Sequence, residues 1–421
     1  MDIVILFLIL FACITISVPI GYSLAIATII CFRFFTNIPL LVVAQTCITG
    51  VDSFPMLAIP FFILAGIIMS KGGVAKRLVT LAQTCLGHVT GGLGIVATVT
   101  CMFFGAISGS ATATASAIGG FMIPEMKEHG YDSGFSASLV AAAGTIGIII
   151  PPSLSFVIYG VVTNSSITDL FIAGIVPGVL MTIVLCVVSY LLSLKNHVPK
   201  MPRVTGKERL HAFWDAKWSL LAPVIILGGI YSGIFTPTEA AVVAIVYSVI
   251  IGMFVYRELN WKDLYDGLKE TMQLGGMIMF MMAIATAFAR YVTLAQVPDK
   301  VVSFITGITD NPVIILMIMN IFLLLVGCII DNIPAVTILA PILLPVAQEA
   351  GLSVIQFGVV IVLNTTIGLI TPPYGPNLFI GATIAKCRLE DMMRSLVPML
   401  LAVIGVLLVV TFFPGISTIF L

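Results

Sequence analysis

The sequence has 421 residues, of which 60% are hydrophobic and 9% are charged, and its mean hydropathy is +1.19. Soluble globular proteins are about 25% charged, so this composition excludes a soluble globular protein and indicates a chain that lies in lipid. The formal net charge is zero, which leaves no electrostatic basis for binding nucleic acid. At roughly 20 apolar residues per crossing, the chain has room for about ten spans.

Apolar segments bounded by proline, glycine or charge predict the membrane spans in chain order. They cover residues 2–17, 20–35, 55–70, 134–162, 171–195, 219–235, 238–256, 272–290, 354–384 and 395–420. Two further apolar stretches, 92–124 and 312–345, are interrupted midway by small or polar residues. We expect each to form a re-entrant helical hairpin that enters and leaves on one side. Irregular backbone is tolerated at that depth only where protein or a wet cavity covers it.

An internal repeat divides the chain into two halves. The stretch from Ser108 to Leu180 aligns without a gap on Ile329 to Leu401, a shift of 221 residues (329 minus 108). At the centre of the match, TIGIIIPP at 145–152 meets TIGLITPP at 366–373. Prolines and glycines mark breaks in the backbone, so their alignment predicts two halves with the same series of helices and one broken helix each. The predicted parts are a first repeat at 1–195, a cytoplasmic linker at 196–218 and a second repeat at 219–421.

Basic residues indicate that the two repeats are inverted, because cytoplasmic loops are enriched in Lys and Arg. Such residues flank the first hairpin and follow the second broken helix: Lys71, Lys76, Arg77, Lys127, Lys386, Arg388 and Arg394. The loops that match the first set hold only Lys300, and the first-half loop 163–169 holds no basic residue. The sequence therefore predicts opposite orientations, with both termini periplasmic. Arg33, near the outer end of the second span, is an exception.

Two hairpin tips and two proline breaks are the candidates for binding. Consecutive prolines cannot continue a helix, so the carbonyls before them, at 147–150 and 368–371, lose their intrahelical donors. Such carbonyls, with the negative ends of the half-helices, suit a hard monovalent cation. The tips add hydroxyl groups at 108–116 and two polar residues at 331–332. We therefore predict two pseudo-symmetric sodium sites, and thus two or more coupling ions, with the substrate between them.

The predicted sodium ligands come from both halves: Ser108, Ser110, Thr112, Thr145, Gly147, Ile150, Asp331, Asn332, Thr366, Gly368 and Thr371. The predicted substrate contacts are Ser110, Thr114, Pro151, Pro152, Pro372, Pro373 and Asn377. Each feature also has a purely structural interpretation, since small residues serve tight helix packing and proline pairs serve as kinks. We favour the sites because tip and break recur together at one spacing. Asp331 has three open roles, as cation ligand, proton carrier or helix cap.

The sequence does not predict an enzyme. A hydrolase inside the membrane needs a nucleophile with a base, a pair of acids, or metal ligands. No His lies within a predicted span, and Asp331 is the only acid expected at midplane depth. The eight cysteines are scattered singly, without the spacing of a metal site. We therefore expect no metal other than sodium.

Several motifs carry a family resemblance: GAISGSATA at 105–113, GTIGIIIPPS at 144–153, FTPTEAA at 235–241, DNIPAVTILAPILLP at 331–345 and TIGLITPPYGPN at 366–377. With these motifs the chain resembles, over essentially its whole length, the large membrane subunit of a tripartite ATP-independent periplasmic (TRAP) transporter. It also matches the looser pattern of the ion transporter superfamily.

The resemblance implies an all-α polytopic protein of the bacterial inner membrane that works as an elevator-type transporter coupled to sodium. It implies two partners, a small four-helix membrane subunit and a periplasmic binding protein that delivers an organic acid. The sequence starts with the first helix of the large subunit, so we expect the small subunit as a separate chain. The sialic-acid branch is the most similar, which makes N-acetylneuraminate the expected substrate. A C4-dicarboxylate permease and a stand-alone proton- or sodium-coupled anion transporter are the alternatives.

Overall fold

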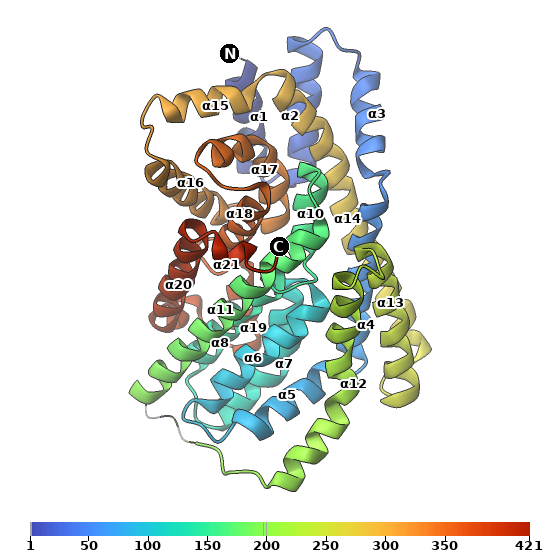
Figure 1. Ribbon diagram of the computed structural model, residues 1–421, viewed down its shortest axis with the longest axis vertical. Coiled ribbons are helices and arrows are strands. Elements are labelled where there is room, and N and C mark those ends of the chain that lie inside the picture. Colours follow the sequence, from blue (N-terminus) through green and yellow to red (C-terminus); the bar gives the residue numbers. More distant parts are fainter. Residues whose placement is uncertain (1, 197, 199) are drawn as a thin grey trace.

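The computed structural model describes residues 2–196, 198 and 200–421, and all regular secondary structure in this part of the chain is helical (Figure 1). Seven of the described helices are long and apolar enough to cross a membrane, and a bent pair, 133–149 with 154–163, makes up to eight. Shorter apolar helices of 10–17 residues complete the bundle. The predicted all-α membrane fold is confirmed.

The first half contains α1 (Asp2–Thr15), α2 (Ile20–Phe35), α3 (Leu40–Val51), the 3₁₀ helix η1 (Phe54–Leu57), α4 (Ala58–Lys71), α5 (Val74–Leu86), α6 (Gly92–Ser108), α7 (Ala111–Glu128), α8 (Ser133–Gly144), α9 (Ile146–Ile149), α10 (Leu154–Thr163) and α11 (Ile167–Lys195). The second half contains α12 (Gly206–Tyr231), α13 (Pro237–Ile250), the π-helical turn η2 (Ile251–Val255), α14 (Trp261–Leu294), α15 (Val297–Thr306), α16 (Pro312–Gly327), α17 (Asn332–Glu349), α18 (Val354–Gly368), α19 (Pro376–Ala385), α20 (Leu389–Phe412) and α21 (Gly415–Thr418).

The helices of the two halves correspond at the shift found in the sequence. Helix α7 starts at residue 111 and α17 at residue 332, a difference of 221. Helices α6, α8 and α10 correspond in the same way to α16, α18 and α19. The hairpin α6–α7 lies in the lower part of Figure 1 and α16–α17 in the upper part, as expected for inverted repeats. The second helix of each hairpin packs on the helix that follows the break of the other half, α7 on α19 and α17 on α10.

Three helices lie where no span is predicted, and two start earlier than the predicted spans. Helices α3, α5 and α15 have only 10–13 residues each, which is too short to cross a membrane. Helix α12 starts at Gly206, inside the predicted linker 196–218, of which residues 197 and 199 lie outside the described part. Its capping box, formed by Thr205 and Glu208, supplies donors and acceptors to the first turn and explains a start among charged residues.

Helix α14 is one continuous helix of 34 residues, of which the sequence predicts only the span at 272–290. A capping box formed by Asn260 and Asp263 starts the helix in the charged segment, and no proline interrupts it before the apolar part. At the same shift, α14 corresponds to α3 and α4 together, where Pro55 interrupts the chain. The two halves therefore differ in this element.

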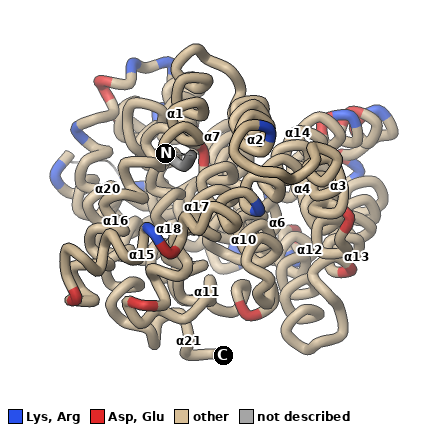
Figure 2. Tube along the Cα trace, turned by 90° about the horizontal axis from the view of Figure 1, so that it is seen from above, with Lys and Arg blue, Asp and Glu red and all other residues tan. Residues whose placement is uncertain are grey.

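Basic residues gather at the end of the molecule where α5 and the starts of α12 and α14 lie, here called the basic end (Figure 1). Ion pairs join α4 to α14 there, with Lys71 Nζ 3.5 Å from Glu270 Oε2, and Arg77 Nη1 lies 2.8 Å from Glu258 Oε1. Lys127 Nζ donates to the Ala385 carbonyl over 2.8 Å, which brings loops of the two halves to the same end. Most of the trace in Figure 2 carries no charge, as a lipid-facing protein requires. Arg33 at the end of α2, Arg290 near the end of α14 and Lys300 in α15 lie on elements at the opposite end.

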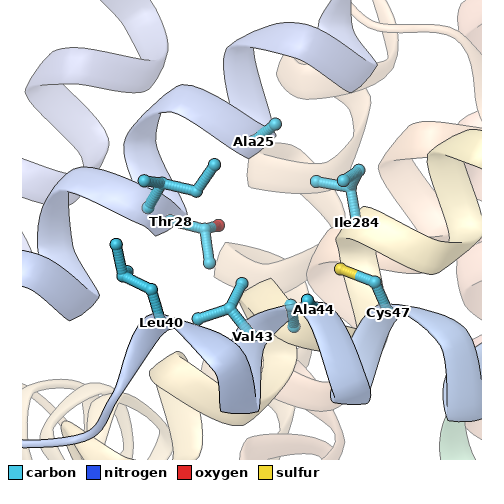
Figure 3. Close-up of a pocket in the computed structure, with 9 residues that line it drawn as sticks. Ala25, Thr28, Leu40, Val43, Ala44, Cys47 and Ile284 are labelled. Carbon is cyan, nitrogen blue, oxygen red and sulfur yellow. The ribbon is translucent and has the colours of Figure 1, made fainter.

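Helices α2, α3 and α14 enclose an apolar hollow of about 210 Å³ (Figure 3). Side chains from all three helices line it, among them Thr28, Val43 and Ile284. Helices α2, α3 and α14 belong to neither the hairpins nor the broken helices, and they pack beside them (Figure 1).

Candidate functional site

The broken helix of the first half is enclosed by protein along its whole length. Helix α8 ends at Gly144, one turn of α9 follows, and α10 resumes after Pro151 and Pro152 at an angle of 42°. The peptide bond between the two prolines is cis. Every residue from 134 to 160 is buried. This burial meets the requirement that non-helical backbone at membrane depth be covered.

The broken helix of the second half has the same order of parts but a different exposure. Residues 356–370 are buried, whereas Pro372, Pro373 and Tyr374 are exposed, Tyr374 at 44%. The bond between these prolines is also cis. Backbone donors reach two of the carbonyls expected to be free, since Thr371 N–H donates to Gly368 O and Asn377 N–H to Leu369 O. Each of these carbonyls keeps a second lone pair.

The first hairpin tip packs directly on the first break and brings four predicted residues together. Ser108 Oγ lies 2.8 Å from Thr114 Oγ1, and that hydroxyl donates to the Ser110 carbonyl over 2.7 Å. A Cβ on Gly147 would lie 2.4 Å from Thr114 Oγ1, so the glycine permits this approach. Leu154 N–H donates to the Gly109 carbonyl, which fastens the tip to α10.

The other first-half candidates lie at the edge of this cluster. Ser110 Oγ is 3.2 Å from Thr112 Oγ1, and Ser110 also caps α7 by accepting from Ala113 N–H. The Thr145 hydroxyl turns back to the Ala142 carbonyl of its own helix. Ile150 is extended and precedes the proline pair.

The second tip forms a buried polar cluster around Asn332, whose exposed fraction is 1%. Its amide nitrogen donates to Thr365 Oγ1 over 2.7 Å and to Thr366 Oγ1 over 3.2 Å. Its amide oxygen accepts from the Ser155 hydroxyl of α10. Asn332 therefore joins the second hairpin, the second broken helix and the first half.

Asp331 caps helix α17. Its Oδ1 accepts from Asn332 N–H over 2.7 Å, and the side chain is partly exposed at the tip. This contact supplies the capping role that was one of three alternatives for Asp331. The roles in binding a cation and in carrying a proton stay predictions. Thr371, nearby in the predicted set, donates to the Ile367 carbonyl over 2.8 Å.

Asn377 is a second link between the halves. It is fully buried, and its amide nitrogen donates to the Ala141 carbonyl of α8 over 3.1 Å. Its amide oxygen is buried without a hydrogen-bond partner among the described residues. An unpaired buried acceptor is costly, so this oxygen is a good ligand for a cation or for a donor group of a substrate.

The sequence pattern missed Ser155 and Thr365, which complete the Asn332 cluster. At the repeat shift Ser155 corresponds to Pro376, so the alignment gives it no polar counterpart. For Thr365 the only signal in the sequence is that it directly precedes Thr366, which is itself a predicted site residue. Both positions depend on contacts between remote segments.

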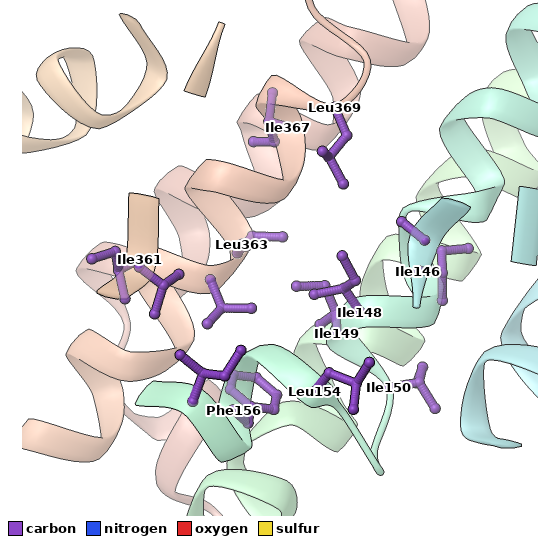
Figure 4. Packing of buried hydrophobic residues seen from close by; sticks show 14 of the residues in the cluster. Ile146, Ile148, Ile149, Ile150, Leu154, Phe156, Ile361, Leu363, Ile367 and Leu369 are labelled. Atoms are coloured by element: carbon purple, nitrogen blue, oxygen red, sulfur yellow. The ribbon is translucent and has the colours of Figure 1, made fainter. Parts of the chain in front are cut away.

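An apolar layer lies between the two broken helices. Ile148 and Ile149 of the first break lie close to Leu363 of α18 in Figure 4. All three are buried. The first break and α18 therefore pack on each other through apolar side chains.

These features define a class of protein. Paired hairpins and broken helices that meet inside a bundle of apolar spans, with polar clusters at the breaks, are the architecture of a secondary membrane transporter. The family model described as "Tripartite ATP-independent periplasmic transporter, DctM component" matches residues 7–416. The chain belongs to this family and is a large permease subunit of a TRAP transporter. The predictions of the family and of a protein that is not an enzyme are confirmed.

Curated relatives support the same membership. The chain is 43% identical over 406 residues to an isethionate TRAP transporter permease of Oleidesulfovibrio alaskensis, covering 96% of this chain and 64% of the relative. It is 44% identical over 366 residues to a C4-dicarboxylate TRAP large permease of Pseudomonas aeruginosa, covering 87% and 86%. It is 38% identical over 403 residues to a sialic acid TRAP permease of Haemophilus influenzae, covering 96% and 65%. The chain thus spans about two thirds of the length of the first and third relatives.

Two solved structures share the fold. The YdaH transporter of Alcanivorax borkumensis aligns with a TM-score of 0.67 at 15% identity, covering 89% of each chain. MtrF of Neisseria gonorrhoeae aligns with a TM-score of 0.60 at 15% identity, covering 93% of this chain and 95% of that one. At this identity the likeness concerns the fold alone.

Proposed function

We propose that the chain imports an organic acid across the bacterial inner membrane, driven by the inward flow of two or more sodium ions. The observation that carries the proposal is the pair of tip-and-break clusters. The first offers hydroxyl and carbonyl oxygens and the second adds the side-chain oxygens of Asp331 and Asn332, which are ligands suited to a hard monovalent cation. The amide oxygen of Asn377, which has no hydrogen-bond partner in the described part of the chain, adds an acceptor at the second break.

The distribution of basic residues supports one orientation of the protein in the membrane. Because cytoplasmic loops are enriched in Lys and Arg, the basic end faces the cytoplasm. The N-terminus lies at the other end in Figure 1, and we propose that both termini are periplasmic. The hairpin α6–α7 then opens toward the cytoplasm and α16–α17 toward the periplasm.

We further propose an elevator mechanism with two partners. The hairpins and broken helices form one packed unit through α7 with α19 and α17 with α10, and this unit is suited to move as a body against α2, α3 and α14. A small four-helix membrane subunit would brace the latter group. A periplasmic binding protein would deliver the substrate.

The substrate class rests on the relatives. They are named for isethionate, C4-dicarboxylates and sialic acid, all organic anions. N-acetylneuraminate, the substrate expected from the sequence resemblance, is one member of this class. The relatives named for isethionate and C4-dicarboxylates are more similar in identity, so an assay should compare all three.

Uptake by proteoliposomes tests the proposal. The chain is reconstituted with the small subunit and the binding protein encoded nearest to its gene, and uptake of labelled N-acetylneuraminate, succinate and isethionate is measured. We expect uptake of one of these anions only with inward sodium and both partners. Replacement of external sodium by potassium should lower the rate to the background of empty vesicles. Undiminished uptake without sodium would contradict coupling to sodium.

Substitution of Asp331 separates sodium from proton coupling. In the Asp331→Asn variant the amide oxygen can still accept from Asn332 N–H, so the cap is retained while the charge is removed. We expect sodium-driven uptake to persist, with half-maximal uptake at a several-fold higher sodium concentration. If Asp331 instead carries the coupled proton, the variant will show no uptake driven by a pH gradient, and the parent will show such uptake without sodium.

A further inference from the structure

Tyr374 is a residue at which the two proline breaks differ. At the repeat shift of 221 it corresponds to Ser153 (374 minus 221). Ser153 is fully buried and caps α10, since its hydroxyl accepts from Phe156 N–H over 3.3 Å. Tyr374 is exposed and caps no helix, because α19 has Gly375 at its N-cap and no side-chain cap. The start of α19 therefore does not account for the tyrosine side chain.

The phenol of Tyr374 lies where an exposed hydroxyl needs a partner. Tyr374 follows the proline pair that separates α18 from α19, so it belongs to a break inside a membrane unit. Among the residues that the structure describes, none forms a hydrogen bond with this phenol. A hydroxyl without a partner is costly in hydrocarbon, and tyrosines that face lipid favour the membrane–water interfaces. The exposed side of Tyr374 therefore faces water or a bound molecule.

Asp331, at the tip of the second hairpin, shares the accessible side of this break. Its side chain is partly exposed, and it is close enough to Tyr374 for the charge of the carboxylate to act on the phenol. One carboxylate oxygen, Oδ1, accepts from Asn332 N–H, which leaves Oδ2 for another donor. Pro372 and Pro373 beside them are also exposed. The accessible side of the second break thus presents an aromatic ring, a phenol and a carboxylate oxygen.

We propose that Tyr374 determines specificity in the permease, with its phenol hydrogen-bonded to a hydroxyl group of the transported acid. The inference rests on the proposed function and names the substrate class as a hydroxylated organic acid. An acid group of the substrate would be repelled by the Asp331 carboxylate, whereas a hydroxyl can donate to that carboxylate and accept from the phenol. The ring adds an apolar surface for the carbon chain. Tyr374 is the only aromatic residue in the tips and breaks at 108–116, 145–153, 331–335 and 366–377.

Substrates that differ by one hydroxyl test the inference. The pairs are isethionate with ethanesulfonate, malate with succinate, and N-acetylneuraminate with its monodeoxy analogues. Sodium-driven uptake of each is measured in proteoliposomes with both partners, for the parent and for Tyr374→Phe, which keeps the ring and removes the phenol. Within the pair that the parent transports, the ratio of kcat/KM for the hydroxylated over the other member should fall about fivefold, through the loss of one hydrogen bond. The same binding protein serves every measurement, so a changed ratio reports on the permease.

Tyr190→Phe is the matched control, because Tyr190 is an exposed tyrosine of α11 outside the tips and breaks. It should leave each ratio unchanged. An unchanged ratio in Tyr374→Phe, or an equal loss for both members of a pair, would overturn the inference, since the phenol would then not bind a hydroxyl. Uptake by the parent without sodium would count against the proposed function and would leave the comparison of ratios in force.

Hydroxyl-radical footprinting of the unaltered chain keeps the inference testable if Tyr374→Phe folds poorly. The reconstituted protein is oxidised in saturating sodium, with and without whichever of isethionate, malate or N-acetylneuraminate it transports, and the modified peptides are quantified by mass spectrometry. We expect the acid to lower the oxidation of Tyr374 several-fold and to leave that of Tyr190 unchanged. Oxidation of Tyr374 that does not respond to any of these acids would contradict contact with the substrate.

Discussion

Replacing Gly368 with alanine should lower the thermal stability of the protein and reduce uptake at least tenfold. A Cβ on Gly368 would lie 2.2 Å from the Gly327 carbonyl oxygen and 2.7 Å from its Cα. These are backbone atoms at the end of α16, so they cannot rotate away as a flexible side chain can. Overpacking of this kind costs about 1–3 kcal/mol, and the strain falls where the second hairpin meets the second break.

Gly120→Ala is the matched control for this substitution. Gly120 lies in α7 of the first hairpin, and nothing comes within 4 Å of a Cβ built there. Alanine is the better helix former by about 1 kcal/mol, so this variant should be as stable as the parent or slightly more so, with normal uptake. Thermal unfolding in detergent and initial uptake rates measure both effects. If Gly368→Ala behaved like Gly120→Ala, close approach of the hairpin to the break would not matter for transport.

The second large effect is expected for Asn332→Ala. The alanine removes two donated hydrogen bonds, to Thr365 and Thr366, and leaves the buried Ser155 hydroxyl without its acceptor. An orphaned buried polar group costs about 1–3 kcal/mol, and the lost contacts add to this. Because Asn332 ties the second tip to the first half, we expect uptake near background at sodium concentrations that saturate the parent.

A double-mutant cycle with Ser155→Ala isolates the link between the halves. If the Ser155 hydroxyl matters through Asn332, the double variant should be less destabilised than the sum of the single variants, with a coupling of about 0.5–3 kcal/mol. Unfolding free energies of the four proteins measure the coupling. Strict additivity would show that Ser155 and Asn332 act separately, and the bridge would then be only a contact of the resting conformation.

The two halves are alike in sequence but unequal in exposure, which bears on the transport cycle. The first proline pair is buried under its hairpin tip, whereas Pro372, Pro373 and Tyr374 are exposed. An inverted repeat allows its halves to exchange such environments as the molecule passes between its two open states. In this structure the second break is therefore the more exposed of the two.

The features that depend on local chemistry could be predicted from the amino-acid sequence. Hydropathy predicted the apolar helices but overcounted the spans, since about ten were predicted and seven, or up to eight with the bent pair, of the described helices are long enough to cross a membrane. The aligned prolines and glycines predicted two hairpins and two broken helices at a fixed shift. A proline pair breaks a helix wherever it occurs, and a membrane crossing needs about 20 apolar residues. The predicted starts of α12 and α14 are too late, because capping boxes at Thr205 and Asn260 begin these helices among charged residues.

Which polar groups meet depends on the packing of helices that are remote in the sequence. Ser155 reaches Asn332 across 177 positions of the chain, and Asn377 reaches Ala141 across 236. Neither pair is related by the repeat, so no shift or motif predicts it. The partner of a buried hydrogen-bonding group depends on how remote helices pack and on the full satisfaction of buried donors and acceptors. For the same reason the chain predicted where oxygens gather but not which of them remain free to bind an ion.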